Sequence, residues 1–204
     1  MSHILLTGFD AFDGREVNAS WIAAQALIAG HRSKHILHGL RIPVCWGAPR
    51  PAVTEAFARW QPHCIIAMGE GAAGAFKIET LARNKRALRK DNNEQLPPHP
   101  LIEPQGQDTY PASTDYTALC ARLSAAGYPA LLSSDAGAYL CEELLYGLES
   151  LKTLHSNLQT VLFVHLPPFG SSVDLHGKRR CCDAALLLEF AEQLLACLDE
   201  QQLL

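Results

Sequence analysis

The feature that most constrains the fold of this 204-residue chain is an alternation of short apolar runs with longer amphipathic stretches. The apolar runs have the character of buried strands and cover residues 4–7, 35–44, 64–68, 130–132 and 161–164. Helical spacing predicts helices over residues 20–29, 52–60, 116–126 and 141–154, and a long final helix over residues 179–198. Strands that alternate with helices of this length imply crossover connections and a mostly parallel twisted sheet. We therefore expect an α/β fold, a three-layer sandwich with helices on both faces of the sheet.

Length and charge limit the classes of protein to which the chain can belong. A chain of 204 residues with 48% hydrophobic residues can bury one substantial core, so we expect a single domain over residues 1–204. No apolar run approaches the roughly 18–20 residues that cross a bilayer, and the first eight residues lack the basic start of a signal peptide. A net charge of −4 offers no general attraction for nucleic acid or an anionic membrane. We expect a soluble cytoplasmic protein without nucleic-acid or membrane partners.

The seven cysteines indicate free thiols. Their number is odd, their spacing is irregular and no CxxC pair occurs, which argues against a disulfide framework or a zinc knuckle. The nearest metal-like group is His176 with Cys181 and Cys182, which lacks paired-ligand spacing and falls partly in the predicted final helix. We expect no bound metal, and one of the thiols is a candidate nucleophile.

One long segment has no periodicity. Residues 90–113 hold five of the twelve prolines, which is typical of a lid, a binding loop or an oligomer contact. In α/β sheets, ligands bind beyond the carboxyl ends of the strands, so the loops that follow the strands are the places to look for chemistry.

The loop after the first strand combines glycines, aspartates and two aromatic residues. It spans residues 8–14 and has neither a GxGxxG pattern nor a phosphate-binding lysine. Phe9 and Phe12 are candidates for the apolar walls of a small-ligand site, and the alternative is that both pack in the core.

Cys141 and His165 are the candidate nucleophile and general base. Cys141 lies near the start of a predicted helix, where free backbone N–H groups and the helix dipole favour a thiolate and could stabilise an oxyanion. His165 ends an apolar strand, and we expect it at the same carboxyl edge of the sheet as Cys141. Each has a simpler alternative interpretation, a small buried cysteine and a hydrogen-bonded core histidine.

Glu79 is the candidate third member of this group. It lies in an alternating stretch that fits a strand, and a carboxylate there could hold the imidazole in its productive tautomer. The basic run that follows, from Arg83 to Lys90, is typical of a solvated face.

Taken together, these segments resemble the pyroglutamyl peptidase I family of cysteine peptidases over nearly the whole chain. The TGFxPFxG loop of that family matches residues 7–14, and its NPSW-like helix start matches residues 18–21. Its nucleophile motif, SxxAGTxxCNxxxYG, matches residues 133–147 around Cys141. Its HxP motif matches residues 165–167, and its ExxxxN stretch matches Glu79 with Asn84. The three matches follow the family order Glu, Cys, His.

The resemblance implies a thiol peptidase that removes N-terminal pyroglutamate through a thioester acyl-enzyme, without metal or cofactor. Cys141 would be the nucleophile, His165 the general base and acid, and Glu79 the orienting carboxylate. The pocket around the lactam ring would be walled by Phe9, Phe12, Tyr139 and Leu140, and Arg89 would have an oxyanion or positioning role. The partners implied are a small peptide substrate with N-terminal pyroglutamate and further copies of the chain, in a homo-oligomer that is often a tetramer.

The chain departs from the family pattern at positions expected to recognise substrate. Glu70 stands where an amide side chain is usual, in a glycine-rich segment about one residue shorter than the family pattern. Lys90 stands where an apolar pocket residue is expected, and Ala138 and Glu142 replace Thr and Asn beside the nucleophile. We expect the Glu142 charge to raise the pKa of Cys141 against the effect of the helix end.

These departures leave two alternatives to pyroglutamyl peptidase activity. The same Cys-His-Glu group could act on a different small acyl or amide substrate, because a changed pocket alters selectivity without abolishing acyl transfer. The chain could also be a non-catalytic homologue with a binding role, in which case Cys141 would be no more reactive than the other thiols.

Overall fold

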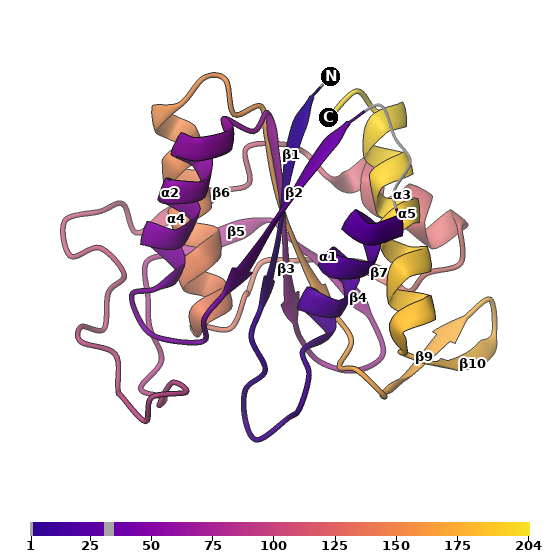
Figure 1. Ribbon diagram of the computed structural model, residues 1–204, viewed down its shortest axis with the longest axis horizontal. Coiled ribbons are helices and arrows are strands. Elements are labelled where there is room, and N and C mark those ends of the chain that lie inside the picture. Colours follow the sequence, from indigo (N-terminus) through magenta and orange to yellow (C-terminus); the bar gives the residue numbers. More distant parts are fainter. Residues whose placement is uncertain (1, 31–34) are drawn as a thin grey trace.

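The computed structural model describes residues 2–30 and 35–204, and its centre is a six-stranded sheet (Figure 1). The spatial order of the strands is β2 (Ile36–Ile42), β1 (His3–Phe9), β3 (Cys64–Glu70), β8 (Thr160–Leu166), β4 (Phe76–Glu79) and β7 (Ala130–Ser133). In the described part of the chain, four neighbouring pairs are parallel and one, β4 with β8, is antiparallel. All residues of β3 and β8 are buried, as expected for central strands covered on both faces.

Helices cover both faces of the sheet, which confirms the predicted three-layer α/β fold. The helices α1 (Ala19–Gly30), α3 (Thr117–Ala125) and α5 (Ala184–Glu200) lie on one face, and α2 (Pro49–Trp60) and α4 (Leu140–Leu154) lie on the other (Figure 1). Each face has its own cluster of buried apolar side chains, because alternate residues of every strand point to opposite sides. The five apolar runs and the first four helices found in the sequence all correspond to elements of the structure.

The direction of β4 and β7 is a detail that the sequence did not reveal. Both strands run opposite to β8 and to the three strands beyond it, because β4 pairs antiparallel with β8 while β7 pairs parallel with β4. The sheet is mixed, although most of its pairs are parallel. Because of this reversal, the chain leaves β7 at the opposite edge of the sheet from the carboxyl end of β8, which affects how α4 approaches β8.

The predicted final helix begins later than expected. Residues 178–181 are not helical; they form β10 (Lys178–Cys181), which pairs antiparallel with β9 (Ser172–Leu175). His176 and Gly177 both have positive φ, at 52° and 74°, which is the backbone of a two-residue hairpin turn. The placement of Cys181 in a helix was therefore wrong, and Cys182 also lies before α5, whose N-cap is Asp183.

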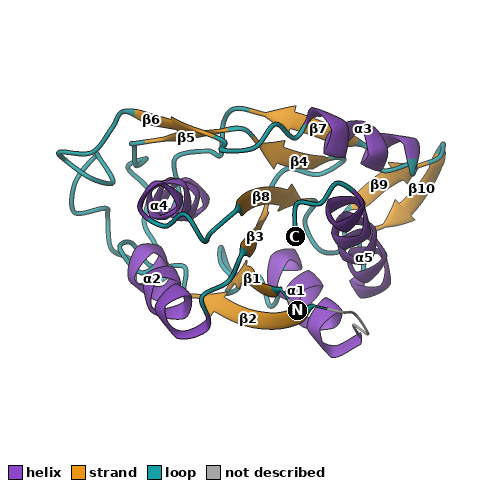
Figure 2. Ribbon diagram, turned by 90° about the horizontal axis from the view of Figure 1, so that it is seen from above, coloured by secondary structure: helices purple, strands orange, loops and turns teal. Residues whose placement is uncertain are grey.

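The proline-rich segment 90–113 is mostly irregular, as predicted, but it contains a short strand. This strand, β6 (Thr109–Pro111), pairs antiparallel with β5 (Leu81–Arg83), and the pair lies beside α4 (Figure 2). None of the helices in the described part of the chain is long and apolar enough to span a bilayer.

Candidate active site

Cys141 occupies the second position of α4. The chain leaves β7 at Ser133 and turns through Gly137 and Ala138, which have φ values of 91° and 56°. The carbonyl of Ala138 accepts a hydrogen bond of 2.6 Å from Ala87 N–H, which holds this turn against the segment that follows β5. The thiol therefore sits among the unpaired N–H groups of a helix start, as the sequence indicated.

Glu79 and His165 form a buried hydrogen-bonded pair. His165 Nδ1 lies 2.8 Å from Glu79 Oε1, and both residues are less than a tenth exposed. In the antiparallel register of β4 and β8, Lys77 lies opposite His165, so Glu79 is a diagonal neighbour of His165 on the same face of the sheet. The two strands thus hold the carboxylate of Glu79 against the imidazole of His165.

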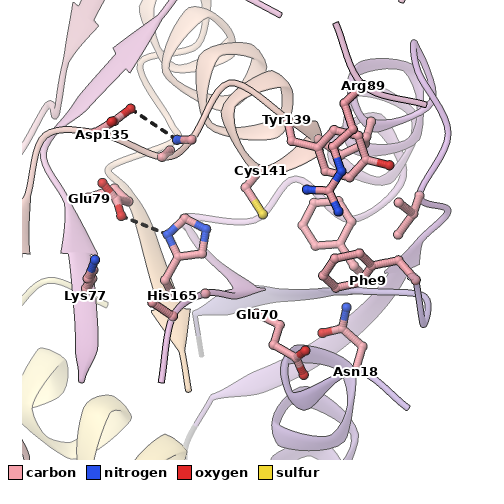
Figure 3. Close-up of a pocket in the computed structure, with 17 residues that line it drawn as sticks. Phe9, Asn18, Glu70, Lys77, Glu79, Arg89, Asp135, Tyr139, Cys141 and His165 are labelled. Carbon is pink, nitrogen blue, oxygen red and sulfur yellow. Dashed lines mark hydrogen bonds and ion pairs between the residues drawn. The ribbon is translucent and has the colours of Figure 1, made fainter. Parts of the chain in front are cut away.

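The thiol of Cys141 faces the same imidazole. A Cβ atom built on Gly69 would lie 2.7 Å from Cys141 Sγ and 3.2 Å from His165 Cδ2, so sulfur and ring border the same glycine. Burial by itself lowers the pKa of His165, but interaction with Cys141 and then with Glu79 outweighs it and raises that pKa to about 10. The three side chains line one cavity, with the sulfur between the imidazole and an aromatic wall (Figure 3).

The route by which Cys141 reaches His165 differs from the prediction. We expected both at one carboxyl edge of the sheet, but β7 and β8 run in opposite directions, so their carboxyl ends point opposite ways. Ser133 ends β7 beside Glu79, which lies next to the middle of β8. The loop after Ser133 can therefore carry Cys141 over the sheet face beside the end of β8.

The cavity has a volume of about 240 Å³, and its apolar side is formed by the predicted pocket residues. Phe9, Phe12, Tyr139 and Leu140 all line it. Phe9 and Leu140 also belong to the buried cluster under α2 and α4, so both interpretations of Phe9 hold at once. The lining also includes residues for which the sequence gave no pocket role, among them Asn18, Val44, Lys77, Asp135 and Ala136.

Arg89 lines the cavity and contacts two rings of its aromatic wall. Its guanidinium forms an ion pair with Asp13 and lies 4.3 Å from the ring centroid of Tyr139 and 5.8 Å from that of Phe12. The contact with both rings is of the cation–π type. Arg89 thereby joins the loop after β1 to the residues just before Cys141.

Comparison with known proteins identifies the family. The model of the pyroglutamyl peptidase family matches residues 2–183. The chain belongs to the pyroglutamyl peptidase family. It is 31% identical over 204 residues to a pyrrolidone-carboxylate peptidase of Gloeobacter violaceus, with 98% of each chain covered.

Solved structures of similar proteins agree with this assignment. One is the pyroglutamyl peptidase I of Bacillus amyloliquefaciens, with a TM-score of 0.82 at 25% identity, covering 97% of this chain and 96% of that one. A pyrrolidone carboxyl peptidase of Fervidobacterium islandicum superposes with a TM-score of 0.87 at 24% identity and covers 98% and 99% of the two chains, which shows a shared fold.

Glu70, a departure from the pattern of the pyroglutamyl peptidase family, lines the cavity with its charge compensated. One carboxylate oxygen accepts the N–H of Ala19, the first residue of α1, at 2.8 Å, and the N–H of Phe169 at 3.3 Å. The other oxygen forms an ion pair with Arg15, whose guanidinium lies 5.2 Å from the Phe12 ring centroid. Nothing in the local sequence links residues 15 and 70, so the pairing was missed.

The two glutamates after Cys141 have structural partners. Glu142 is fully buried, and its carboxylate accepts the N–H of Arg83 at 2.6 Å; burial raises its pKa despite this bond. Glu143 forms a buried ion pair with Arg86 at 2.8 Å. The interpretation of the basic run as a solvated face was therefore wrong at Arg86. The effect of Glu142 on the Cys141 thiol stays a prediction.

Lys90, another departure from the family pattern, is not among the residues that line the cavity. Its amine forms an exposed ion pair with Glu94, and only its carbonyl approaches the site, where it accepts the Tyr139 hydroxyl at 2.9 Å. Within residues 2–30 and 35–204, no group of three or more His, Cys, Asp or Glu residues could hold a metal ion.

Proposed function

We propose that this protein is a cysteine peptidase that removes an N-terminal pyroglutamyl residue from peptides. The observation that carries the proposal is one cavity in which a thiol at a helix start faces a buried imidazole–carboxylate pair beside an aromatic wall. Membership of the pyroglutamyl peptidase family supports the same substrate.

In this mechanism Cys141 is the nucleophile and His165 carries the proton. The thiolate attacks the carbonyl carbon of the pyroglutamyl residue, and the C–N bond to the next residue breaks as the His165 imidazolium gives its proton to the leaving amine. The product is a thioester between Cys141 and the pyroglutamyl group, whose lactam ring stays intact. A water molecule then attacks the thioester carbonyl while His165 takes one of its protons, and the C–S bond breaks, which releases pyroglutamate and restores the Cys141 thiolate and the imidazolium.

Glu79 and the start of α4 support this chemistry. The Glu79 carboxylate accepts from Nδ1, which leaves Nε2 of His165 to face the reacting atoms and stabilises the protonated ring. The backbone N–H groups at the start of α4 are donors for the developing oxyanion.

We assign the lactam ring to the aromatic side of the cavity. Phe9, Phe12, Tyr139 and Leu140 supply apolar contact for a flat ring. The ion pair of Arg89 with Asp13 and its contacts with two of these rings support a positioning role for Arg89.

A second candidate function is hydrolysis of a different small acyl or amide substrate by the same three residues. Glu70 favours it, because a carboxylate lines the cavity where the family pattern has an amide. The negative charge of Glu70 is compensated by Arg15 and by the start of α1, which reduces the weight of this argument. Pyroglutamyl hydrolysis therefore remains the proposal that the site supports best.

The test is hydrolysis of a fluorogenic pyroglutamyl amide by the wild-type protein, Cys141→Ala and the control Cys120→Ala in reducing buffer. Turnover by the wild type and by Cys120→Ala, and none by Cys141→Ala, is expected. No wild-type turnover, with Cys141 still alkylated by iodoacetamide faster than the other thiols, would favour the second function. An unreactive Cys141 would indicate a non-catalytic homologue. The comparison of alkylation rates is informative because burial raises the pKa of four other thiols and makes them slow to react. These are Cys45, Cys64, Cys120 and Cys182.

We further propose that the protein works in the cytoplasm as a homo-oligomer, with a tetramer as the specific expectation. All seven cysteines are free, which fits a reducing compartment. Leu96, in the proline-rich segment, and Leu88 just before it are 50% and 83% exposed and could contact another copy. Light scattering of the purified protein measures the number of copies, and a monomer would contradict the proposal.

A further inference from the structure

Lys77 is a charged residue in the cavity wall to which the mechanism assigns no role. It lies on β4 directly opposite His165, and opposite residues of an antiparallel pair project from the same face of the sheet. Its amine has no ion pair or hydrogen bond with any residue that the structure describes. Figure 3 shows the side chain at the end of the cavity where Glu79 and His165 lie.

The other charged side chains of the cavity wall have opposite charges beside them. Among the described residues, Glu79 is paired with His165 and Arg89 with Asp13. The remaining two carboxylates are also paired: Glu70 with Arg15, and Asp135 with Arg83 and Lys85. The amine of Lys77 is therefore an uncompensated positive charge in a cavity whose carboxylates already have partners.

The position of Lys77 relative to the thiol indicates which part of a substrate it meets. In Figure 3 the aromatic side of the cavity, with Phe9 and Tyr139, lies on one side of Cys141, while His165 and Lys77 lie on the other. A lactam ring on the aromatic side places the scissile nitrogen toward His165, which must protonate it. The residue that leaves with this nitrogen then extends toward Lys77.

We propose that Lys77 binds a carboxylate on the leaving residue, so that the enzyme prefers pyroglutamyl substrates whose second residue carries one. The α-carboxylate of a dipeptide is separated from the scissile nitrogen by a single carbon atom, and the flexible stem of lysine lets its amine follow a ligand placed there. A partly buried cation attracts such a group more strongly than an exposed one does. This inference rests on the proposed function and names Lys77 as a specificity-determining residue of the same site.

The experiment compares two substrates that differ in one charge. Pyroglutamyl-alanine has a free α-carboxylate, and pyroglutamyl-alaninamide does not. We expect wild-type kcat/KM to be about tenfold higher for the acid at low ionic strength, and this ratio to fall as salt screens the charges. A second pair, pyroglutamyl-aspartic acid α-amide and pyroglutamyl-asparaginamide, distinguishes a side-chain carboxylate from an α-carboxylate as the group that is bound.

Variants assign the preference to Lys77. In Lys77→Gln the ratio of the two kcat/KM values should fall to about one, while Lys77→Arg should retain most of it, because the charge is kept. The matched control is Lys90→Gln, which removes the same charge from an exposed ion pair outside the cavity and should keep the wild-type ratio.

The outcomes separate this inference from the function on which it rests. If the wild type cleaves neither alanine substrate nor the fluorogenic amide, the proposed function fails and the inference fails with it. If the wild type cleaves both alanine substrates equally well, the inference alone is overturned, whether or not the variants fold. It is also overturned if Lys77→Gln slows both substrates by the same factor, because Lys77 would then act through Glu79 or His165 and not on the leaving residue.

Discussion

Replacement of Glu79 by Gln tests whether the carboxylate charge sets the proton affinity of His165. The amide has the same shape and can still accept a hydrogen bond from Nδ1, which lies 2.8 Å from Oε1, so the main change is the loss of a buried negative charge. At a charge separation of about 4 Å and an effective dielectric constant of about 20, the attraction between the two groups is about 4 kcal/mol. This corresponds to an upper limit of about 3 pKa units.

The direction of the effect follows from the role of His165 as the acid for the leaving amine. The imidazole must hold its proton in the first step, and activity is lost as pH rises through the His165 pKa, which is about 10 in the wild type. Loss of the Glu79 charge lowers this pKa, although the Cys141 contribution remains. The alkaline limb of kcat/KM should therefore move to lower pH by about 1–3 units.

The assay is the dependence of kcat/KM for the fluorogenic amide on pH between about 6 and 11. At neutral pH we also expect the rate of Glu79→Gln to fall by about 10²–10⁴, the loss typical when the orienting acid of a triad becomes an amide. The control is Glu55→Gln, which removes the same charge from an exposed position on α2 and should behave like the wild type. A wild-type rate and an unmoved alkaline limb in Glu79→Gln would refute the reasoning and make Glu79 a structural residue.

Three further predictions concern the site and its supports. Gly69→Ala should lower kcat/KM about 100-fold with the fold intact, because the new Cβ would lie 2.7 Å from Cys141 Sγ and displace the thiol. The control is Gly30→Ala, whose Cβ meets no atom of the described residues within 4 Å, and equal rates in the two variants would contradict the site geometry. Asp183→Ala should lower the free energy of unfolding in urea by about 1 kcal/mol, because Asp183 caps α5 through Leu186 N–H, and an unchanged midpoint would count against the cap. Burial raises the pKa of Glu149 from 4.5 to about 7, so ionisation costs stability as pH rises through this range. Relative to Glu149→Gln, the wild type should lose up to about 3 kcal/mol of its free energy of unfolding between pH 5 and 8. If the unfolding temperatures of the two proteins change with pH in the same way, Glu149 is not desolvated.

The sequence was sufficient to predict the elements that carry the candidate site. Cys141 at the start of a helix and Glu79 on a strand both follow from local periodicity, which depends on residues close together in the chain. The hairpin of β9 and β10 was missed because its four-residue strands are too short for periodicity to separate them from the helix that follows.

The candidate pocket was predicted less completely than the three residues proposed for catalysis. The expected pocket residues line the cavity, and they could be named in advance because they match motifs of the family or lie beside them. They are Phe9, Phe12, Tyr139, Leu140 and Arg89. Charge partners were not predicted: Glu70 meets Arg15 from 55 residues away, and no local pattern joins these positions.

The sequence by itself determined most of the α/β elements and their order, and it supplied the thiol, imidazole and carboxylate that we propose for catalysis, since these depend on neighbouring residues and on motifs. Only the tertiary structure decided that β4 and β7 run against β8. It thereby decided that Lys77 stands opposite His165 and that Cys141 reaches the imidazole across the face of the sheet. Strand direction and charge pairing join residues that are distant in the chain, and their energies depend on how the layers pack and not on any single segment.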